Sequence, residues 1–117
     1  MTGKLTTHIL DTMLGKPAGG VRIDLSQSSG NNQDFLKTIH TNADGRTPEA
    51  VLEGAGMVPG QYQLLFYIAD YHRGIHSPDA GKFLDRVPIV FVITDPAAHY
   101  HVPLLVSPWS YSTYRGS

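Results

Sequence analysis

Hydrophobic and polar residues alternate along several short stretches of this 117-residue chain. From residue 21 to residue 26, apolar and polar side chains alternate without interruption, which is the pattern of an antiparallel strand with one buried face. Residues 99–106 alternate in the same way, so that His99 and His101 share one face. The opposite face is expected in the core and contains Tyr100, Val102, Leu104 and Val106.

Turn residues divide the chain into a series of short strands. Gly, Pro, Asn and Asp are concentrated between the alternating stretches, and Asn42-Ala43-Asp44-Gly45 has the composition of a tight turn. A single helix is predicted over residues 70–77, with Asp70 as its cap and Pro78 ending it. Loops are expected at 15–20 and 27–34. Strands are expected at 5–11, 21–26, 35–41, 62–70, 87–93, 99–106 and 110–115, with one short edge strand between 47 and 60.

This arrangement predicts an all-β protein with a single domain, residues 1–117. Seven or eight strands with one short helix are most simply accommodated in an antiparallel β-sandwich. The last strand contains neither Lys nor Pro, the residues that commonly protect an exposed sheet edge. We therefore expect that strand to pair with another subunit.

Composition excludes several classes of partner. The net charge is −1, which provides no field to attract nucleic acid or an anionic membrane surface. No apolar stretch is long enough to span a bilayer, and the first ten residues lack the apolar segment of a signal peptide. The chain contains no cysteine, so disulfides and thiolate chemistry are excluded. We expect a bacterial cytoplasmic protein, although a mature periplasmic form would have the same sequence.

Histidines provide the candidate chemistry, and simpler interpretations compete with each functional one. His99 and His101 form an H-x-H pair that could bind zinc or copper, but no cysteine or nearby carboxylate supplies further ligands. We therefore predict no metal there. The simpler interpretation of this pair is one solvated and one hydrogen-bonded imidazole. His72 and His76 are spaced by one helical turn and are expected at the surface, and His40 on a polar strand face gives no stronger signal.

His8, His101 and Arg46 form the stronger combination. His8 and His101 both point away from the predicted core, and paired imidazoles that titrate near neutrality suit proton transfer from water. Arg46 follows the Asp44-Gly45 turn directly. There it is either an ordinary surface arginine or a fixed guanidinium that binds a carbonyl or an anionic ring.

Motifs spread over the whole chain resemble the 5-hydroxyisourate hydrolases, the purine-degrading branch of the transthyretin-like family. Near the start stand Leu5-Thr6-Thr7-His8-Ile9-Leu10-Asp11-Thr12 and Gly15-Lys16-Pro17-Ala18, followed later by Asp44-Gly45-Arg46. Near the end stand Tyr100-His101-Val102-Pro103-Leu104-Leu105 and the closing Tyr114-Arg115-Gly116-Ser117. The terminal tetrapeptide is the most specific of these motifs, because the hormone carrier transthyretin lacks it.

The resemblance implies a transthyretin-like antiparallel β-sandwich that assembles as a homotetramer, a dimer of dimers, with no cofactor. The implied reaction is hydrolysis of 5-hydroxyisourate to 2-oxo-4-hydroxy-4-carboxy-5-ureidoimidazoline in urate degradation, by attack of a His-activated water on a cyclic amide. The resemblance implies catalytic roles for His8, Arg46, His101 and Ser117. It implies substrate contacts by His8, Arg46, Tyr114, Arg115 and Gly116.

Two other functions compete with this hypothesis. A transthyretin-like sandwich could carry a small aromatic ligand without altering it, but a passive apolar carrier does not need two imidazoles, a guanidinium and a basic tail. A metal-dependent hydrolase could use His99 and His101 as ligands. Accelerated decay of 5-hydroxyisourate would separate an enzyme from a carrier, and activity in a chelator would exclude the metal-dependent reaction.

Overall fold

The computed structural model describes residues 2–116. Seven strands have three or more residues, two strands have only two, and one α-helix and one short 3-10 helix complete the described chain. The helices are α1 (Ile68–Gly74) and η1 (Gly54–Gly56). The strands are β1 (Lys4–Asp11), β2 (Lys16–Pro17), β3 (Arg22–Ser29), β4 (Asn32–His40), β5 (Leu52–Glu53), β6 (Gly60–Phe66), β7 (Val87–Ile93), β8 (His99–Val106) and β9 (Tyr111–Thr113).

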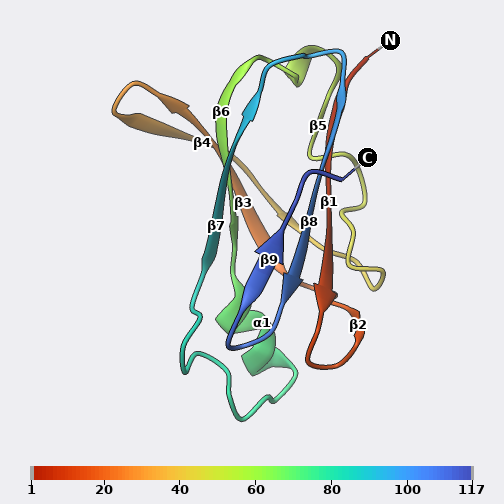
Figure 1. Cartoon of the computed structure of the whole chain (residues 1–117), viewed down its shortest axis with the longest axis vertical. Helices are drawn as coiled ribbons and strands as arrows, with labels where there is room; N and C mark the ends of the chain where they lie inside the picture. The colour runs from red at the N-terminus through yellow and green to blue at the C-terminus, as the bar shows by residue number, and fades with distance from the viewer. Residues whose placement is uncertain (1, 117) are drawn as a thin grey trace.

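Two sheets face each other, as the predicted sandwich requires, and α1 lies at one end of them (Figure 1). The first sheet has the order β2-β1-β8-β9, with β5 also pairing with β1. The second has the order β4-β3-β6-β7. All pairs are antiparallel except β1 with β8, which run parallel with Thr6 opposite His101 and His8 opposite Pro103. Strands from the two ends of the chain therefore lie side by side.

The core fills the space between the two sheets. The predicted inward face of residues 99–106 is confirmed, because Tyr100, Val102, Leu104 and Val106 are all buried. Along β1, Leu5, Thr7 and Ile9 are buried and their neighbours Thr6 and His8 are half-buried. The other large, fully buried apolar side chains come mainly from the second sheet and include Ile23, Leu25, Tyr62, Leu64, Phe66 and Ile93.

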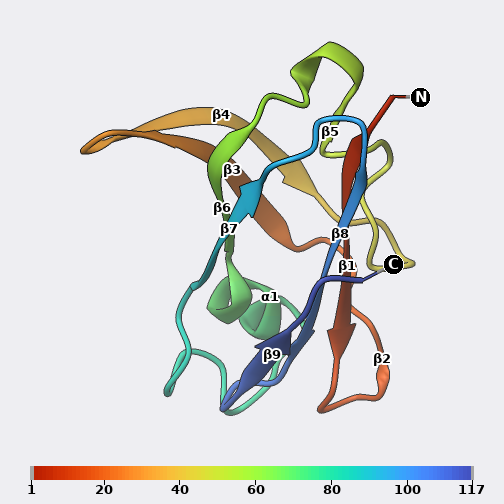
Figure 2. The same cartoon turned by 45° about the horizontal axis from the view of Figure 1, so that its top comes forward.

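The predicted loop at 27–34 is wrong, because these residues extend β3 and β4 into a long hairpin. Figure 2 shows this hairpin projecting beyond the rest of the molecule. Its turn is reduced to Gly30 and Asn31, with Gly30 at a φ of 63° that a glycine adopts without strain. Backbone pairing stabilises strands whose side chains are polar on both faces, and such strands have no hydrophobic alternation to reveal them.

The predicted helix begins and ends too late in the chain. It starts at Ile68 with Tyr67 as the N-cap, so Asp70 lies in the first turn and binds Arg73 at 2.8 Å instead of capping. The strand predicted over 62–70 correspondingly ends at Phe66. A continuous apolar run cannot be assigned to strand or helix by its pattern alone. Burial settles it here, because the inward residues Ile68, Ala69, Tyr71 and His72 follow helical spacing.

Smaller differences concern the edges of the first sheet. The expected short edge strand is β5, which pairs with the start of β1. Two residues of the predicted loop at 15–20 form β2, and the last strand covers only 111–113 instead of 110–115. No helix in the described chain is both long and apolar enough to cross a bilayer.

A buried polar network attaches α1 to the end of β1. Asp11 is fully buried, and its Oδ1 accepts the backbone N–H groups of Met13 and Leu14 at 2.9 and 3.0 Å. The hydroxyl of Tyr71 donates to its Oδ2 at 2.7 Å. Burial, with the hydrogen bond to Asp11, raises the pKa of Tyr71, so the hydroxyl keeps its proton. His72, predicted at the surface, is fully buried beside them and donates from Nδ1 to the carbonyl of Ile68.

Replacing Tyr71 should destabilise the fold, because Tyr71→Phe removes the hydroxyl donor and leaves Oδ2 of Asp11 buried without it. The expected loss is about 1–3 kcal/mol of unfolding free energy. Urea unfolding at one fixed protein concentration measures it. Tyr111→Phe is the matched control, because Tyr111 is exposed on β9. Equal unfolding midpoints for the two variants would contradict the role given to this network.

Candidate active site

The outer face of the first sheet carries the candidate site. Because side chains alternate along a strand, Thr6 and His8 on β1 share the outer face with His99 and His101 on β8. The parallel register sets Thr6 directly beside His101 and Lys4 beside His99. The two imidazole rings on β8 are 6.5 Å apart between centroids. Two strands thus bring three histidines and one threonine onto a single surface.

Thr6 links the two histidines of β8. Its Oγ1 lies 3.0 Å from Nε2 of His99 and 2.8 Å from Nδ1 of His101, both within hydrogen-bond range. His99 is exposed, whereas His101 is half-buried. Among residues 2–116, the hydrogen bonds of His101 leave its Nε2 without a partner. That nitrogen is therefore available to a water or a substrate.

A tight turn places Arg46 beside His8. Asn42 organises the turn, since its Oδ1 accepts the N–H of Asp44 at 2.9 Å and its own N–H donates to the carbonyl of Arg46 at 2.8 Å. Gly45 has a φ of 73°, and a Cβ there would lie 2.4 Å from the carbonyl oxygen of Ile9, so only glycine fits. Arg46 then forms an isolated bridge with His8. Arg46 and Thr6 both line a cavity of about 160 Å³.

The end of the chain returns to His101 after β9. The N–H of Gly116 donates to the carbonyl of His101 at 2.8 Å. A Cβ at position 116 would lie 2.5 Å from Cδ2 of His101, so the absence of a side chain lets the tail pack against the imidazole. The structure therefore brings Gly116 against His101, on which the charges of Arg46 and His8 also act. Ser117, predicted to be catalytic, lies outside the described residues.

Tyr114 and Arg115 point to a different place within one protomer. Both line a mainly apolar cavity of about 250 Å³ at the open edge between the sheets, together with Tyr100. Arg115 donates from Nη2 to the carbonyl of His99 at 3.2 Å, and its guanidinium lies 4.7 Å from the centre of the Tyr100 ring. These contacts hold the tail against β8. Direct contact of Tyr114 and Arg115 with a substrate stays a prediction.

The surroundings of His101 favour its neutral form. Burial lowers the pKa of this imidazole below its usual value, and the positive charges of Arg46, His8 and His99 lower it further. A base must be unprotonated to accept a proton from water. The lowered pKa keeps a larger share of His101 in that state at neutral and mildly acidic pH.

The remaining histidines do not join the cluster formed by His8, His99 and His101. His72 is buried next to Asp11, while His40 and His76 are exposed on other elements. No group of three or more His, Cys, Asp or Glu side chains among residues 2–116 is arranged to hold a metal ion. Thr6 occupies the space between His99 and His101 instead, with its hydroxyl within hydrogen-bond distance of both.

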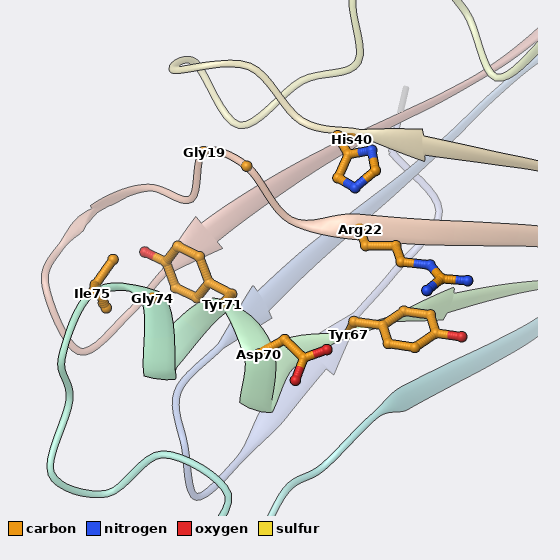
Figure 3. A pocket seen from close by; sticks show the side chains of 9 residues that line it. Gly19, Arg22, His40, Tyr67, Asp70, Tyr71, Gly74 and Ile75 are labelled. Carbon is orange, nitrogen blue, oxygen red and sulfur yellow. The ribbon is translucent and has the colours of Figure 1, made fainter.

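A second polar cavity, of about 380 Å³, lies beside α1 and away from the cluster (Figure 3). His40 and Arg22 reach it from β4 and β3, and Asp70 and Tyr71 reach it from the helix (Figure 3). Its charged groups already have partners, because Arg22 donates to Asp24 and Asp70 pairs with Arg73. We assign no chemistry to this cavity.

Sequence reasoning selected His8, Arg46, His101 and Gly116 and missed Thr6. His8, Arg46 and His101 were selected from their residue types and their expected faces. Thr6 was missed because its importance depends on the parallel pairing of β1 with β8, which alternation along either strand does not reveal. The only signal for it was that Thr6 shares the outer face with His8.

The pKa of His101 can be tested by NMR titration. We expect its imidazole to titrate below about 6.5, the usual value for histidine. Arg46→Gln removes one of the charges that lower this pKa, so the midpoint should rise towards that value. Arg86→Gln is the control, because Arg86 is exposed and lies beside Tyr67 and Asp85. A midpoint above 6.5 in the unaltered protein, or no rise in Arg46→Gln, would contradict this electrostatic account.

Known proteins of similar sequence and structure include several 5-hydroxyisourate hydrolases. The chain is 52% identical to 5-hydroxyisourate hydrolase 2 of Rhizobium meliloti, with 99% of this chain and 98% of that protein covered. It is 45% identical to 5-hydroxyisourate hydrolase of Mus musculus, with 97% and 94% covered. The Klebsiella pneumoniae 5-hydroxyisourate hydrolase structure superposes with a TM-score of 0.80 at 35% identity, covering 97% of this chain and 99% of that one.

Two further matching structures carry other names, (S)-allantoin synthase and transthyretin. A crystal structure of (S)-allantoin synthase has a TM-score of 0.92 at 43% identity. The match covers 99% of this chain but only 44% of that chain. Transthyretin from sea bream, in complex with thyroxine, has a TM-score of 0.83 at 28% identity, with 97% and 94% covered. Residues 5–116 match the family described as HIUase/Transthyretin. The chain therefore belongs to the HIUase/Transthyretin family.

Proposed function

We propose that this protein hydrolyses 5-hydroxyisourate in urate degradation, at the outer face of β1 and β8. The observation that carries the proposal is the convergence of His8, Arg46 and His101 beside the tail, in a chain about half identical over its length to named 5-hydroxyisourate hydrolases. The protein is an enzyme of the cyclic amide hydrolase class. Its product is the carboxylated ureidoimidazoline.

His101 activates the attacking water in this mechanism. Nε2 accepts a proton as the water oxygen bonds to the ring carbonyl carbon, and the same nitrogen returns the proton to the ring nitrogen when the C–N bond breaks. His8, two positions along β1 from Thr6, helps to orient the water. The lowered pKa of His101 supports this role, because the unprotonated base predominates at neutral pH.

Arg46 stabilises the negative charge that develops on the carbonyl oxygen. A cation placed where the charge develops is effective, because its position costs no reorganisation during the reaction. The hydrogen-bonded turn at 42–45 holds the backbone of Arg46 against β1. Gly116 packs on His101, and Tyr114, Arg115 and Ser117 are proposed to position the substrate ring.

The active form is proposed to be a homotetramer, a dimer of dimers. Strands β7 and β9 are the outer strands of their sheets, and Val90, Val92 and Tyr111 on them are largely exposed. Parallel strand pairs normally lie in sheets covered on both faces, whereas the outer face of β1 and β8 is only half-buried in one protomer. Both features support a covering subunit. The predicted bacterial cytoplasmic location stays a prediction.

A binding protein for a small aromatic ligand is the alternative function, and the apolar cavity lined by Phe91, Tyr100 and Val102 is the feature that favours it. That cavity could hold an aromatic ring without any chemistry. Such a carrier needs no base with a lowered pKa beside a guanidinium. Turnover therefore separates the two functions.

The purified protein should accelerate the decay of freshly generated 5-hydroxyisourate, measured by ultraviolet absorbance against the spontaneous rate. His101→Asn removes the base and should lower kcat by about 10²- to 10⁴-fold. His76→Asn is the matched control, because His76 is exposed and adopts a φ of 61° that asparagine tolerates. Activity should persist in chelator, since the mechanism uses no metal.

Circular dichroism and sedimentation should first establish that both variants are folded and equal in size to the unaltered protein. A folded His101→Asn variant with undiminished kcat would remove His101 from the mechanism. No acceleration by the unaltered protein would favour the binding function, and loss of activity in chelator would favour the metal-dependent alternative.

A further inference from the structure

Thr6 and its neighbour His99 are polar side chains of this surface that the proposed mechanism does not use. Thr6 stands between the two imidazoles of β8, with Oγ1 at 2.8 Å from Nδ1 of His101 and 3.0 Å from Nε2 of His99. A hydroxyl has a single proton, so it can donate to only one of these nitrogens and must accept from the other. Two arrangements of the three groups are therefore possible, and they differ in where His101 carries its proton.

In the first arrangement, Nδ1–H of His101 donates to Thr6 and the Thr6 hydroxyl donates to Nε2 of His99. Nε2 of His101 then has a free lone pair, as a base requires. In the second arrangement, Nε2–H of His99 donates to Thr6 and Thr6 donates to Nδ1 of His101. The proton of neutral His101 would then be on Nε2, and that nitrogen could not accept a proton from water.

We infer that Thr6 is a positioning residue for the hydrolysis, which holds His101 as the Nδ1–H tautomer while His99 accepts the Thr6 hydroxyl proton. The inference rests on the proposed function, and it extends that function to Thr6 and His99, to which the mechanism assigns no role. Thr6 is well placed for this purpose, because the parallel pairing of β1 with β8 fixes its Cα opposite that of His101.

The charged groups near these three residues affect the pKa of His101. The direction of the hydrogen bonds from His101 through Thr6 to His99 depends on Thr6 and His99 themselves. Arg46 and His8 face His101 from the turn and from β1, and their charges disfavour a second proton on its ring. The tail packs against the Cδ2 edge of the His101 ring, since a Cβ on Gly116 would lie 2.5 Å from that atom. His99 is exposed, so its other nitrogen, Nδ1, can keep its proton while Nε2 accepts from Thr6.

Nitrogen-15 NMR of histidine-labelled protein reads the tautomer directly, without substrate. The unaltered protein should show His101 protonated on Nδ1 near pH 7.5. Thr6→Val removes the hydroxyl with little change in volume and should shift His101 towards the Nε2–H tautomer. The same variant should lose about 10- to 100-fold in kcat with KM changed by less than about threefold. Thr6→Ser keeps the hydroxyl and should restore both the tautomer and most of kcat.

Thr7→Val is the matched control. It removes a hydroxyl from the adjacent residue, which faces the core and donates to the carbonyl of Val102 at 2.7 Å. This variant should lose stability while keeping the His101 tautomer and kcat. His99→Leu gives a second test, because it leaves Thr6 intact but without its acceptor. The Thr6 hydroxyl can then donate to His101, so a shift towards Nε2–H and a lower kcat are expected.

Several results would overturn the inference. His101 protonated on Nε2 in the unaltered protein would reverse the proposed direction of the chain. An unchanged tautomer and kcat in folded Thr6→Val would show that Thr6 does not position the base. The same result in His99→Leu would show that His99 does not determine the direction of these hydrogen bonds. If the unaltered protein did not hydrolyse 5-hydroxyisourate at all, the proposed function would fail, while the tautomer measurement would still decide whether Thr6 orients His101.

Discussion

The parallel pairing of β1 with β8 is the constraint on which the site depends. The two strands are separated by almost the whole chain, yet their register places Thr6 beside His101 and His8 beside Pro103. A shift of one residue would turn every side chain of one strand to the other face, burying the polar residues and exposing Leu5 and Ile9. The core and the site therefore select the same register, because Leu5 and Ile9 on β1 and the inward residues of β8 are buried in it.

Local contacts at one end of β1 and along the strand preserve this geometry. At one end, Asp11 accepts hydrogen bonds from the following turn and from Tyr71 on α1. Along the strand, the carbonyl of Gly45 accepts the N–H of Ile9, which keeps the turn that carries Arg46 against β1. The chain end packs on His101 through Gly116. The groups of the proposed site thus come from four separate segments, each held by backbone hydrogen bonds of the scaffold.

The sequence was informative wherever one face of a strand is buried. Alternation predicted the sandwich, the inward face of β8 and the outward direction of His8 and His101. It could not predict the outer part of the β3–β4 hairpin, residues 27–34, since neither face is buried there, nor the start of α1 within an apolar run. The neighbours of each strand are set by contacts across the whole chain, so neither Thr6 nor the buried group of Asp11, Tyr71 and His72 could be recognised in advance.

A crystal structure of the assembled protein with a stable purine analogue tests the central claim most directly. The account predicts one analogue in contact with His8, Arg46, His101 and the chain end, with Nε2 of His101 facing the ring and Thr6 hydrogen-bonded to Nδ1. An analogue bound elsewhere, or a site in which these four groups lie too far apart to touch one purine-sized molecule, would contradict it.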